Sequence, residues 1–225
     1  MLSVIAASRK GYEDLSRRIE AKTGETFVSI TDPADLTLER LEELDPRYIF
    51  FPHWSHLISA DIFERFECII FHMTDLPFGR GGSPLQNLIS RGIYQTQMTA
   101  LRCIKELDAG PIYLKKPFAL DGRAEEIYQR AATLIEEMIV DILLEQPQPV
   151  DQIGNPTSFR RRKPHQSEMG PIATLDQAYD HIRMLDADGY PRAFVETNHL
   201  RFEFDRVARH DGSLVAQVTI YEKDK

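Results

Sequence analysis

One stretch of the sequence combines residue types that acid–base chemistry needs. His72 ends an apolar run, and a loop rich in proline and glycine follows it directly. Asp108 comes later, in a short Asp-Ala-Gly turn. An imidazole can take up a proton near neutral pH, and a carboxylate can orient the ring and stabilise its protonated form. The pattern predicts that His72 and Asp108 form a proton-transferring pair beside a ligand.

The elements around His72 predict a layered α/β fold with a mainly parallel, Rossmann-like sheet. Short apolar runs alternate with segments of helical periodicity, an order typical of parallel sheets covered on both faces. In such sheets ligands bind beyond the carboxyl ends of the strands. We therefore expect the loops 52–59 and 72–84 to face the site. The predicted strands are Leu2–Ala6, Thr26–Ile30, Tyr48–Phe51 and Glu67–Phe71, and the predicted helices are Tyr12–Lys22, Asp32–Leu44 and Ala60–Phe66.

The rest of the chain predicts the end of this domain and a small β-rich annex. We place a catalytic domain at residues 1–150, and a linker with a C-terminal subdomain at 151–225. The long helix Arg123–Leu144 should carry Glu136, Glu137 and Asp141 on its solvent side. The other predicted helices are Pro84–Ser90 and Leu175–Leu185, and the other predicted strands are Gln97–Ile104, Pro111–Lys115, Phe194–Glu196, Leu200–Phe204 and Leu214–Tyr221.

Charge and hydropathy limit the classes of partner. The formal net charge is −8, and neither predicted part has the basic surplus that binding to a phosphate backbone usually needs. We therefore expect no nucleic-acid partner. No apolar stretch is long enough for a membrane span, and no signal peptide is evident, so we expect a cytoplasmic protein without a membrane partner. The basic run at residues 160–163 is interpreted as a solvated linker or as a diphosphate contact.

Several motifs with their own chemistry are absent from the sequence. The first predicted strand is not followed by the glycine pattern of dinucleotide-binding folds. Cys68 and Cys103 lie in apolar runs and are expected to be buried, reduced thiols. His53 and His56 flank Trp54, but with no acidic residue nearby they are interpreted as ligand-contacting or packing residues rather than metal ligands. We expect no metal.

Three ordered motifs resemble the formyltransferase domain that uses 10-formyltetrahydrofolate. Family members carry Asn-x-His-x-x-x-Leu-Pro at a strand end, then Arg-Gly-Gly-x-Pro, then Leu-Asp-x-Gly-x-Ile. This sequence has His72 with Leu76-Pro77, then residues 80–84, then residues 107–112, in the same order and at similar spacing. The resemblance covers roughly residues 47–145. It implies a formyl transfer to an amine, with 10-formyltetrahydrofolate as the donor.

The C-terminal part resembles sugar N-formyltransferases, closest to those of nonulosonic-acid (pseudaminic-type) pathways. The resemblance rests on residues 159–164, on Ile182-Arg183 and on residues 189–194. It implies that the partners are folate and a nucleotide-linked aminosugar whose amino group is formylated. The oligomeric state stays open, a homodimer included.

The resemblance also implies roles for individual residues. His72 would be the base, Asp108 would stabilise its protonated ring, and His53 is a further catalytic candidate. The pterin would lie against Phe51, Pro52, Trp54 and Ser55, and against the backbone of Ile104, Lys105, Glu106 and Leu107. The substrate would contact Thr74, Asp75, Arg80, Gly81, Gly82, Ser83 and Asn87.

One position departs from the family pattern. Ile70 replaces the asparagine that, in the family, helps to hold the oxyanion formed when the amine attacks. Loss of such a donor costs about 2.7–4 kcal/mol in the barrier. The candidates for a substitute donor are His53, Ser55, Thr74 and Asn87, and we favour His53 because it follows the neighbouring strand.

Other functions remain open at this point. Within the family they are formylation of methionyl-tRNA and hydrolysis of the formyl donor. A chain that lost catalysis together with the asparagine could be a module that binds folate or a sugar.

Overall fold

The computed structural model describes residues 1–9, 11–12 and 14–223, which form two compact units. Unit 1 comprises residues 1–81, 96–118 and 129–158, and unit 2 comprises residues 82–95, 119–128 and 159–225. Each unit is assembled from segments that are distant in the sequence, whereas the sequence predicted one boundary after residue 150.

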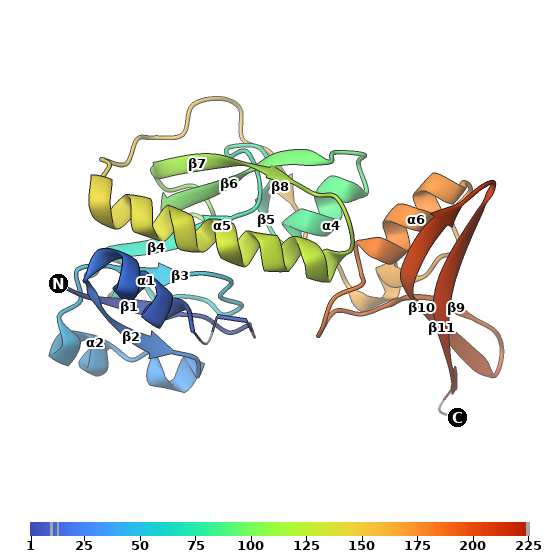
Figure 1. Ribbon diagram of the computed structural model, residues 1–225, viewed down its shortest axis with the longest axis horizontal. Coiled ribbons are helices and arrows are strands. Elements are labelled where there is room, and N and C mark those ends of the chain that lie inside the picture. The colour runs from blue at the N-terminus through green and yellow to red at the C-terminus, as the bar shows by residue number, and fades with distance from the viewer. Residues whose placement is uncertain (10, 13, 224–225) are drawn as a thin grey trace. The chain divides into compact units, whose positions relative to one another are not determined.

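Unit 1 is built on a six-stranded sheet with the order β2-β1-β3-β4-β6-β7 (Figure 1). The first four strands in this order are parallel, and β6 pairs with β4 in the antiparallel direction. The predicted α/β fold with a mainly parallel sheet is therefore confirmed. The strands are β1 (Leu2–Ala6), β2 (Thr26–Ile30), β3 (Ile49–Phe51), β4 (Cys68–His72), β6 (Gln95–Arg102) and β7 (Ile112–Ala119).

The helices of unit 1 follow the predicted order, with one interruption. The predicted helix from Asp32 to Leu44 divides into a 3₁₀ turn and α2, because Asp32 caps the first and Thr37 caps the second with a side-chain oxygen. The elements are α1 (Leu15–Thr23), the 3₁₀ turn Pro33–Asp35, α2 (Leu38–Leu44), α3 (Ala60–Phe63) and α5 (Ala124–Glu145), whose first turn belongs to unit 2.

Apolar side chains from this sheet and its helices form the core beneath the strand ends. The buried cluster consists of Val4, Ala6, Ile30, Leu41, Ile49, Phe51, Ile62 and Cys68. Both thiols are free, and Cys68 is buried as predicted, but Cys103 is only half-buried. Burial raises the pKa of the Cys103 thiol to about 11, so it stays protonated at neutral pH. No described helix is both long and apolar enough to cross a membrane.

The packing of α5 against α1 corrects one expectation about charge. Glu136 was expected on the solvent side of α5, but it is only 6% exposed. Its carboxylate accepts hydrogen bonds from Arg18 Nε (2.6 Å) and Lys22 Nζ (2.7 Å), both on α1. Burial alone would raise the pKa of Glu136, but the bonds from these two cations outweigh it and lower the pKa. Glu136 therefore joins the two helices, which lie side by side in Figure 1.

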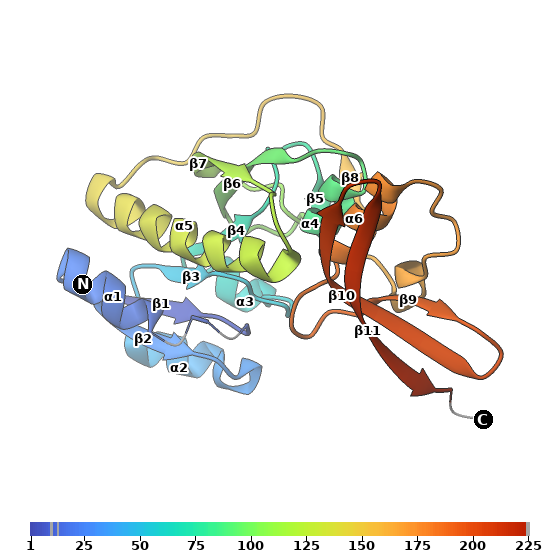
Figure 2. The same ribbon diagram turned by 45° about the vertical axis from the view of Figure 1, so that its right-hand side comes forward.

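Unit 2 contains a three-stranded antiparallel sheet with the order β11-β10-β9, which confirms the predicted β-rich C-terminal part (Figure 2). The hairpin β10–β11 is longer than predicted, with a register shift between Asp205 and Ala208. The elements are α4 (Pro84–Ile89), the 3₁₀ turn Pro164–Ser167, α6 (Leu175–Arg183), β9 (Ala193–Glu196), β10 (Leu200–His210) and β11 (Ser213–Glu222). The short strands β5 (Arg80–Gly81) and β8 (Ser158–Phe159) pair with each other.

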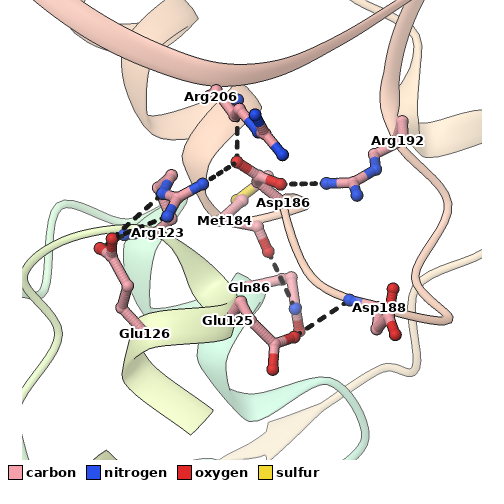
Figure 3. Close-up of polar contacts among 9 residues, drawn as sticks. All are labelled: Gln86, Arg123, Glu125, Glu126, Met184, Asp186, Asp188, Arg192 and Arg206. Carbon is pink, nitrogen blue, oxygen red and sulfur yellow. Dashed lines mark hydrogen bonds and ion pairs between the residues drawn. The ribbon is translucent and has the colours of Figure 1, made fainter. Parts of the chain in front are cut away.

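A buried carboxylate organises the segments of unit 2. Asp186 is 5% exposed, and its side chain pairs with Arg123 (3.5 Å) and with Arg192 (Figure 3). The Arg206 N–H donates to the same carboxylate (2.8 Å), and the Glu125 N–H donates to the Asp186 carbonyl (3.0 Å). Asp186 thereby connects the start of α5, the residues before β9 and the bend of β10.

The turn between β6 and β7 requires a glycine at position 110. A Cβ at this position would overlap the carbonyl oxygen of Arg102, the last residue of β6. The Arg102 N–H also donates to the Pro111 carbonyl (2.8 Å), so the two chain segments cannot separate without losing this bond. The position of Asp108, two residues earlier, therefore depends on the missing side chain of Gly110.

We predict that Glu136→Gln lowers the free energy of unfolding at pH 7 by about 1–3 kcal/mol, because hydrogen bonds to a charged acceptor are lost. The folded-state pKa of Glu136 lies below its unfolded value. Its contribution is therefore full above the unfolded pKa and is lost as the pH falls through the folded pKa. Urea unfolding at pH 7 and pH 3 measures this: the variant should lose less stability on acidification than the wild type. Glu137→Gln, at an exposed side chain 3.7 Å from Lys116, is the control and should change little.

We predict that Gly110→Ala destabilises the protein by about 1–3 kcal/mol or more, because the added methyl group forces the turn away from β6. Gly170→Ala is the matched control, since its Cβ would meet only the flexible end of Glu168, at 3.8 Å. Thermal unfolding of both variants is the measurement. Equal melting temperatures for the two would contradict the steric argument.

Candidate active site

The structure brings His72 and Asp108 together, as the sequence predicted. His72 is the last residue of β4, and Asp108 lies in the turn between β6 and β7. His72 Nδ1 is 3.6 Å from Asp108 Oδ2, and each side chain is only 9% exposed. β4 and β6 are antiparallel neighbours, and His72 lies opposite Thr99, so the chain leaves β6 beside the first residues of β4 and returns to bring Asp108 next to His72. The pair has the composition and arrangement of a base with its orienting carboxylate.

The second nitrogen of the His72 ring is also beside an oxygen. Nε2 lies 2.8 Å from the carbonyl oxygen of Gly79. Both neighbours, the Gly79 carbonyl and the Asp108 carboxylate, can only accept hydrogen bonds. Only a ring protonated on both nitrogens can therefore donate to each of them. The ring thus lies between two acceptors, with the Gly79 carbonyl within hydrogen-bond distance of Nε2 and the Asp108 carboxylate 3.6 Å from Nδ1.

Asp108 also holds the glycine-rich loop. Its Oδ2 accepts a hydrogen bond from the Gly81 N–H (2.8 Å), so one oxygen faces both the loop and the imidazole. The backbone of Asp108 has a φ of +51°, in the left-handed region that L residues rarely adopt. Residues in this region are typical of sites where the surrounding structure imposes a conformation that function needs.

Two residues that sequence reasoning missed fix the surroundings of this pair. Gln152 Nε2 donates to the carbonyls of Asp108 and Gly110 (2.9 Å each), and its Oε1 accepts from the Arg80 guanidinium (2.7 and 3.1 Å). Thr157 Oγ1 accepts from the Gly79 N–H (2.8 Å). Both lie in the segment interpreted as a linker. No signal in a single sequence distinguishes them, because glutamine and threonine are ordinary linker residues.

The loop after β3 carries the residues proposed to contact the pterin. Phe51 and Pro52 are buried, and the Trp54 ring meets the Phe51 ring at an edge (5.9 Å between centroids). Trp54 Nε1 is buried without a hydrogen-bond partner within the described residues. His53 has a φ of +56°, and Ser8 Oγ ties the loop by donating to the His53 carbonyl (3.1 Å) and accepting from the Ser55 N–H (3.0 Å).

The second segment proposed for the pterin lies before Asp108. Ile104 is half-buried, Lys105 and Glu106 are exposed, and the Leu107 side chain is 65% exposed. These assignments remain predictions.

The predicted substrate-contacting residues differ in their exposure. Thr74 is fully buried, its hydroxyl faces the Gly79 carbonyl (3.4 Å), and its own carbonyl accepts from Thr99 (2.7 Å). Asp75 is exposed and pairs with Lys115 (2.6 Å). Arg80 and Gly81 are held by Gln152 and Asp108, as described above. The buried Thr74 side chain therefore holds the backbone of the loop at Gly79, whereas the exposed Asp75 carboxylate can be reached from solvent.

Gly82, Ser83 and Asn87 belong to unit 2, where they form a tight cluster with the chain after β8. Asn87 Nδ2 donates to the carbonyls of Gly82 (3.0 Å), Ser83 (3.1 Å) and Arg160 (3.1 Å). Its Oδ1 accepts from Arg91 (2.9 Å). The Asn87 side chain therefore connects residues 82–83 to residue 160 within unit 2.

These contacts reduce the candidates for the missing oxyanion donor. Ile70 is partly buried and packs against the apolar core cluster, so its position supplies no donor. The amide protons of Asn87 are already donated to carbonyls, and the Thr74 hydroxyl faces one. His53 and Ser55 lie on the loop tied to Ser8, and their role as oxyanion donors stays a prediction.

Comparisons with known proteins place this site in a family. The family described as "Methionyl-tRNA formyltransferase, C-terminal domain" matches residues 164–221. A solved structure, methionyl-tRNA formyltransferase from Clostridium thermocellum, is 44% identical, with a TM-score of 0.96 over 99% of this chain and 100% of that one. Methionyl-tRNA formyltransferase of Thermotoga maritima is 31% identical over 47% of this chain, and the match spans 35% of that relative's length.

The comparisons correct the predicted substrate. A sugar N-formyltransferase from Shewanella covers the whole chain but is only 16% identical (TM-score 0.71), so it shares the fold alone. The prediction of an aminosugar N-formyltransferase with a nucleotide-sugar partner is wrong, and so is the exclusion of nucleic acid. The substrate prediction came from the resemblance of residues 159–164, 182–183 and 189–194 to sugar N-formyltransferases, and the exclusion of nucleic acid came from the net charge, which says nothing about a local surface. The broader implication of the three motifs is confirmed. The chain belongs to the formyltransferase family, whose members use 10-formyltetrahydrofolate as the formyl donor.

Proposed function

We propose that this chain transfers a formyl group from 10-formyltetrahydrofolate to the amino group of methionyl-tRNA. The observation that carries the proposal is the 44% identity, over essentially the full chain, to the C. thermocellum methionyl-tRNA formyltransferase. The buried contact between His72 and Asp108 supports it independently, because it supplies the acid–base pair that acyl transfer to an amine requires.

The residues of unit 1 fit a folate donor. Trp54 Nε1 is a buried donor without an acceptor in the described chain, and a pterin ring carries acceptors along its edge. Leu107, 65% exposed, offers an apolar surface to the same kind of flat ring. We assign the loop 51–55 and the segment 104–107 to the donor. When bound, 10-formyltetrahydrofolate supplies a formyl carbon that is open to attack, and its nitrogen takes up a proton as it leaves.

His72 moves the proton in this scheme. A primary amine becomes acidic as its nitrogen bonds to the formyl carbon, and a ring nitrogen of His72 accepts the proton. Once protonated, the ring faces the Asp108 carboxylate, whose Oδ2 lies 3.6 Å from Nδ1. His72 Nε2 must leave the Gly79 carbonyl in order to reach the amine, so a shift of the loop 73–79 belongs to the mechanism.

The oxyanion is assigned to the loop after β3. His53 is the favoured donor, because it follows β3, the strand next to β4, and Ser55 on the same loop is the second. A donor that replaces the family asparagine recovers about 2.7–4 kcal/mol of the barrier. A cytoplasmic location, where charged tRNA is found, is part of the same proposal.

We predict that His72→Ala and Asp108→Ala each reduce formyl transfer by at least about 100-fold, as for groups that act in proton transfer. The assay mixes the protein with 10-formyltetrahydrofolate and methionyl-tRNA, and follows formylmethionyl-tRNA and tetrahydrofolate. Asp35→Ala, at an exposed carboxylate, is the control and should leave the rate unchanged.

Each outcome of this assay has one interpretation. Formylated tRNA that disappears in the His72 and Asp108 variants supports the proposal. Near-normal rates in either variant would remove the proton-transfer role. Release of tetrahydrofolate without any need for the amine would identify a hydrolase instead, and binding of the donor without turnover would identify a non-catalytic module.

A further inference from the structure

The segment 150–157 follows α5 and lies beside the candidate site in unit 1 (Figure 1). Val150 pairs with Ile112, at the start of β7, through two backbone hydrogen bonds (2.7 and 2.9 Å). Residues 153–157 are exposed, and the Ile153 side chain is 87% exposed. A segment with so little buried surface depends on polar contacts to stay in place. The half-buried side chain of Gln152 provides such contacts.

The Gln152 amide uses its full capacity for hydrogen bonds. Nε2 donates to the carbonyls of Asp108 and Gly110 (2.9 Å each). Oε1 accepts from Nε (3.1 Å) and Nη2 (2.7 Å) of Arg80. An amide nitrogen carries two protons and an amide oxygen has two lone pairs, so all four are engaged. Gln152 therefore bridges the turn that carries Asp108 and the Arg80 side chain.

The residue type at position 152 matches this bridge. Backbone carbonyls only accept and a guanidinium only donates, so the side chain between them must donate on one side and accept on the other. A carboxylate would suit Arg80 but would turn an oxygen toward two carbonyl oxygens. An ammonium group would suit the carbonyls but would repel Arg80. An amide satisfies both neighbours, and either kind of charged side chain fails with one of them.

The turn that Gln152 holds has an unusual backbone conformation. Asp108 has a φ of +51°, in the left-handed region, where an L residue stays only if the surrounding structure fixes it. The bond to the Asp108 carbonyl fixes the peptide plane directly after the Asp108 Cα. It thereby limits rotation of the backbone from which the carboxylate projects.

The chemistry is sensitive to the position of this carboxylate. Asp108 Oδ2 lies 3.6 Å from His72 Nδ1, which is slightly longer than a hydrogen bond, and accepts from the Gly81 N–H at 2.8 Å. Displacement of a reacting group by about 1 Å can lower a rate by as much as about 100-fold. A residue that fixes the Asp108 turn therefore influences how the His72 ring is oriented.

We propose that Gln152 is a positioning residue for formyl transfer, which acts through the Asp108 carboxylate on the His72 ring. The inference rests on the proposed function and deepens it by naming a residue, outside the three motifs, on which the rate depends. The bonds of Gln152 go to backbone carbonyls and to Arg80, so its effect passes through the residues that it holds. Through Arg80 it also joins the Asp108 turn to the glycine-rich loop.

Two substitutions separate this positioning role from simple attachment of the segment. Gln152→Ala removes all four bonds and should lower kcat about tenfold, with KM for 10-formyltetrahydrofolate and methionyl-tRNA within about twofold of the wild type. Gln152→Glu keeps the contact with Arg80 but loses the donor to the Asp108 turn, so it should be as slow. Asn155→Ala, at an exposed amide of the same segment, is the control and should leave kcat unchanged.

A double-mutant cycle tests the route through Asp108. If Gln152 acts by placing that carboxylate, its substitution has nothing to act on once the carboxylate is removed. Gln152→Ala should therefore slow Asp108→Ala by less than about twofold. A further tenfold loss in the double variant would show two independent effects and would overturn the proposal. So would a Gln152→Glu variant with the wild-type rate, because attachment of the segment would then be sufficient.

Amide hydrogen exchange gives a readout that does not depend on activity. The Gly81 N–H donates to the Asp108 carboxylate, so displacement of the carboxylate should leave this proton less protected. Exchange at Gly81 should be about tenfold faster in Gln152→Ala and Gln152→Glu than in the wild type and in Asn155→Ala. The Gln152→Glu variant, which is close to the wild type in shape, keeps the test valid if Gln152→Ala folds poorly.

The outcomes separate this inference from the proposed function. Normal kcat or unchanged exchange at Gly81 in both Gln152 variants, in a wild type that formylates methionyl-tRNA, overturns the positioning role alone. A wild type that does not formylate methionyl-tRNA overturns the proposed function, and the kinetic role of Gln152 with it. Faster exchange at Gly81 in such a protein would still support the hold of Gln152 on the Asp108 turn.

Discussion

One oxygen of the Asp108 carboxylate is the contact on which the candidate site depends. It lies 3.6 Å from the His72 ring and accepts a 2.8 Å hydrogen bond from the backbone of Gly81. A displacement of Asp108 would therefore alter the base and the glycine-rich loop together. Three features fix the position of Asp108. Gly110 allows the turn to pack closely on β6, and Gln152 donates a hydrogen bond to the Asp108 carbonyl. The backbone of Asp108 itself has a left-handed conformation.

Charge in this protein is organised locally, and this explains why the net charge misled the sequence analysis. Ion pairs such as those of Glu136 and Asp186 remove cations as well as carboxylates, so pairing leaves the net charge of −8 unchanged. Cations are nevertheless gathered in one place, since Arg160, Arg161 and Lys163 are exposed and nearly consecutive. A sum over the sequence does not show such a local cluster.

The sequence allowed the main elements and the central pair to be predicted, because both depend on local signals. Apolar strands β1 and β2 were placed at their observed bounds, and the segments of His72 and Asp108 were recognised from their motifs. The expectation that the two residues meet at adjoining strand ends was wrong, because β6 runs antiparallel to β4 and ends beside the first residues of β4. Glu136 was misplaced because helical periodicity does not reveal a cationic partner on another helix. Gln152 and Thr157 could not be predicted, since their importance arises from distant backbone groups that only the folded chain brings near. The substrate was misjudged because similar motifs serve different amines.

The replacement of the family asparagine by Ile70 removes a side-chain donor from β4. Ile70 packs against the apolar cluster, so this position gives the core an apolar contact and offers no hydrogen bond to an oxyanion. Thr74 and Asn87 use their protons to hold backbone carbonyls. The loop after β3 carries the two donors that we propose instead, His53 and Ser55. Ser8 fixes the backbone of this loop, because its hydroxyl donates to the His53 carbonyl and accepts from the Ser55 N–H. A side chain just after β1 therefore contributes to where these proposed donors lie.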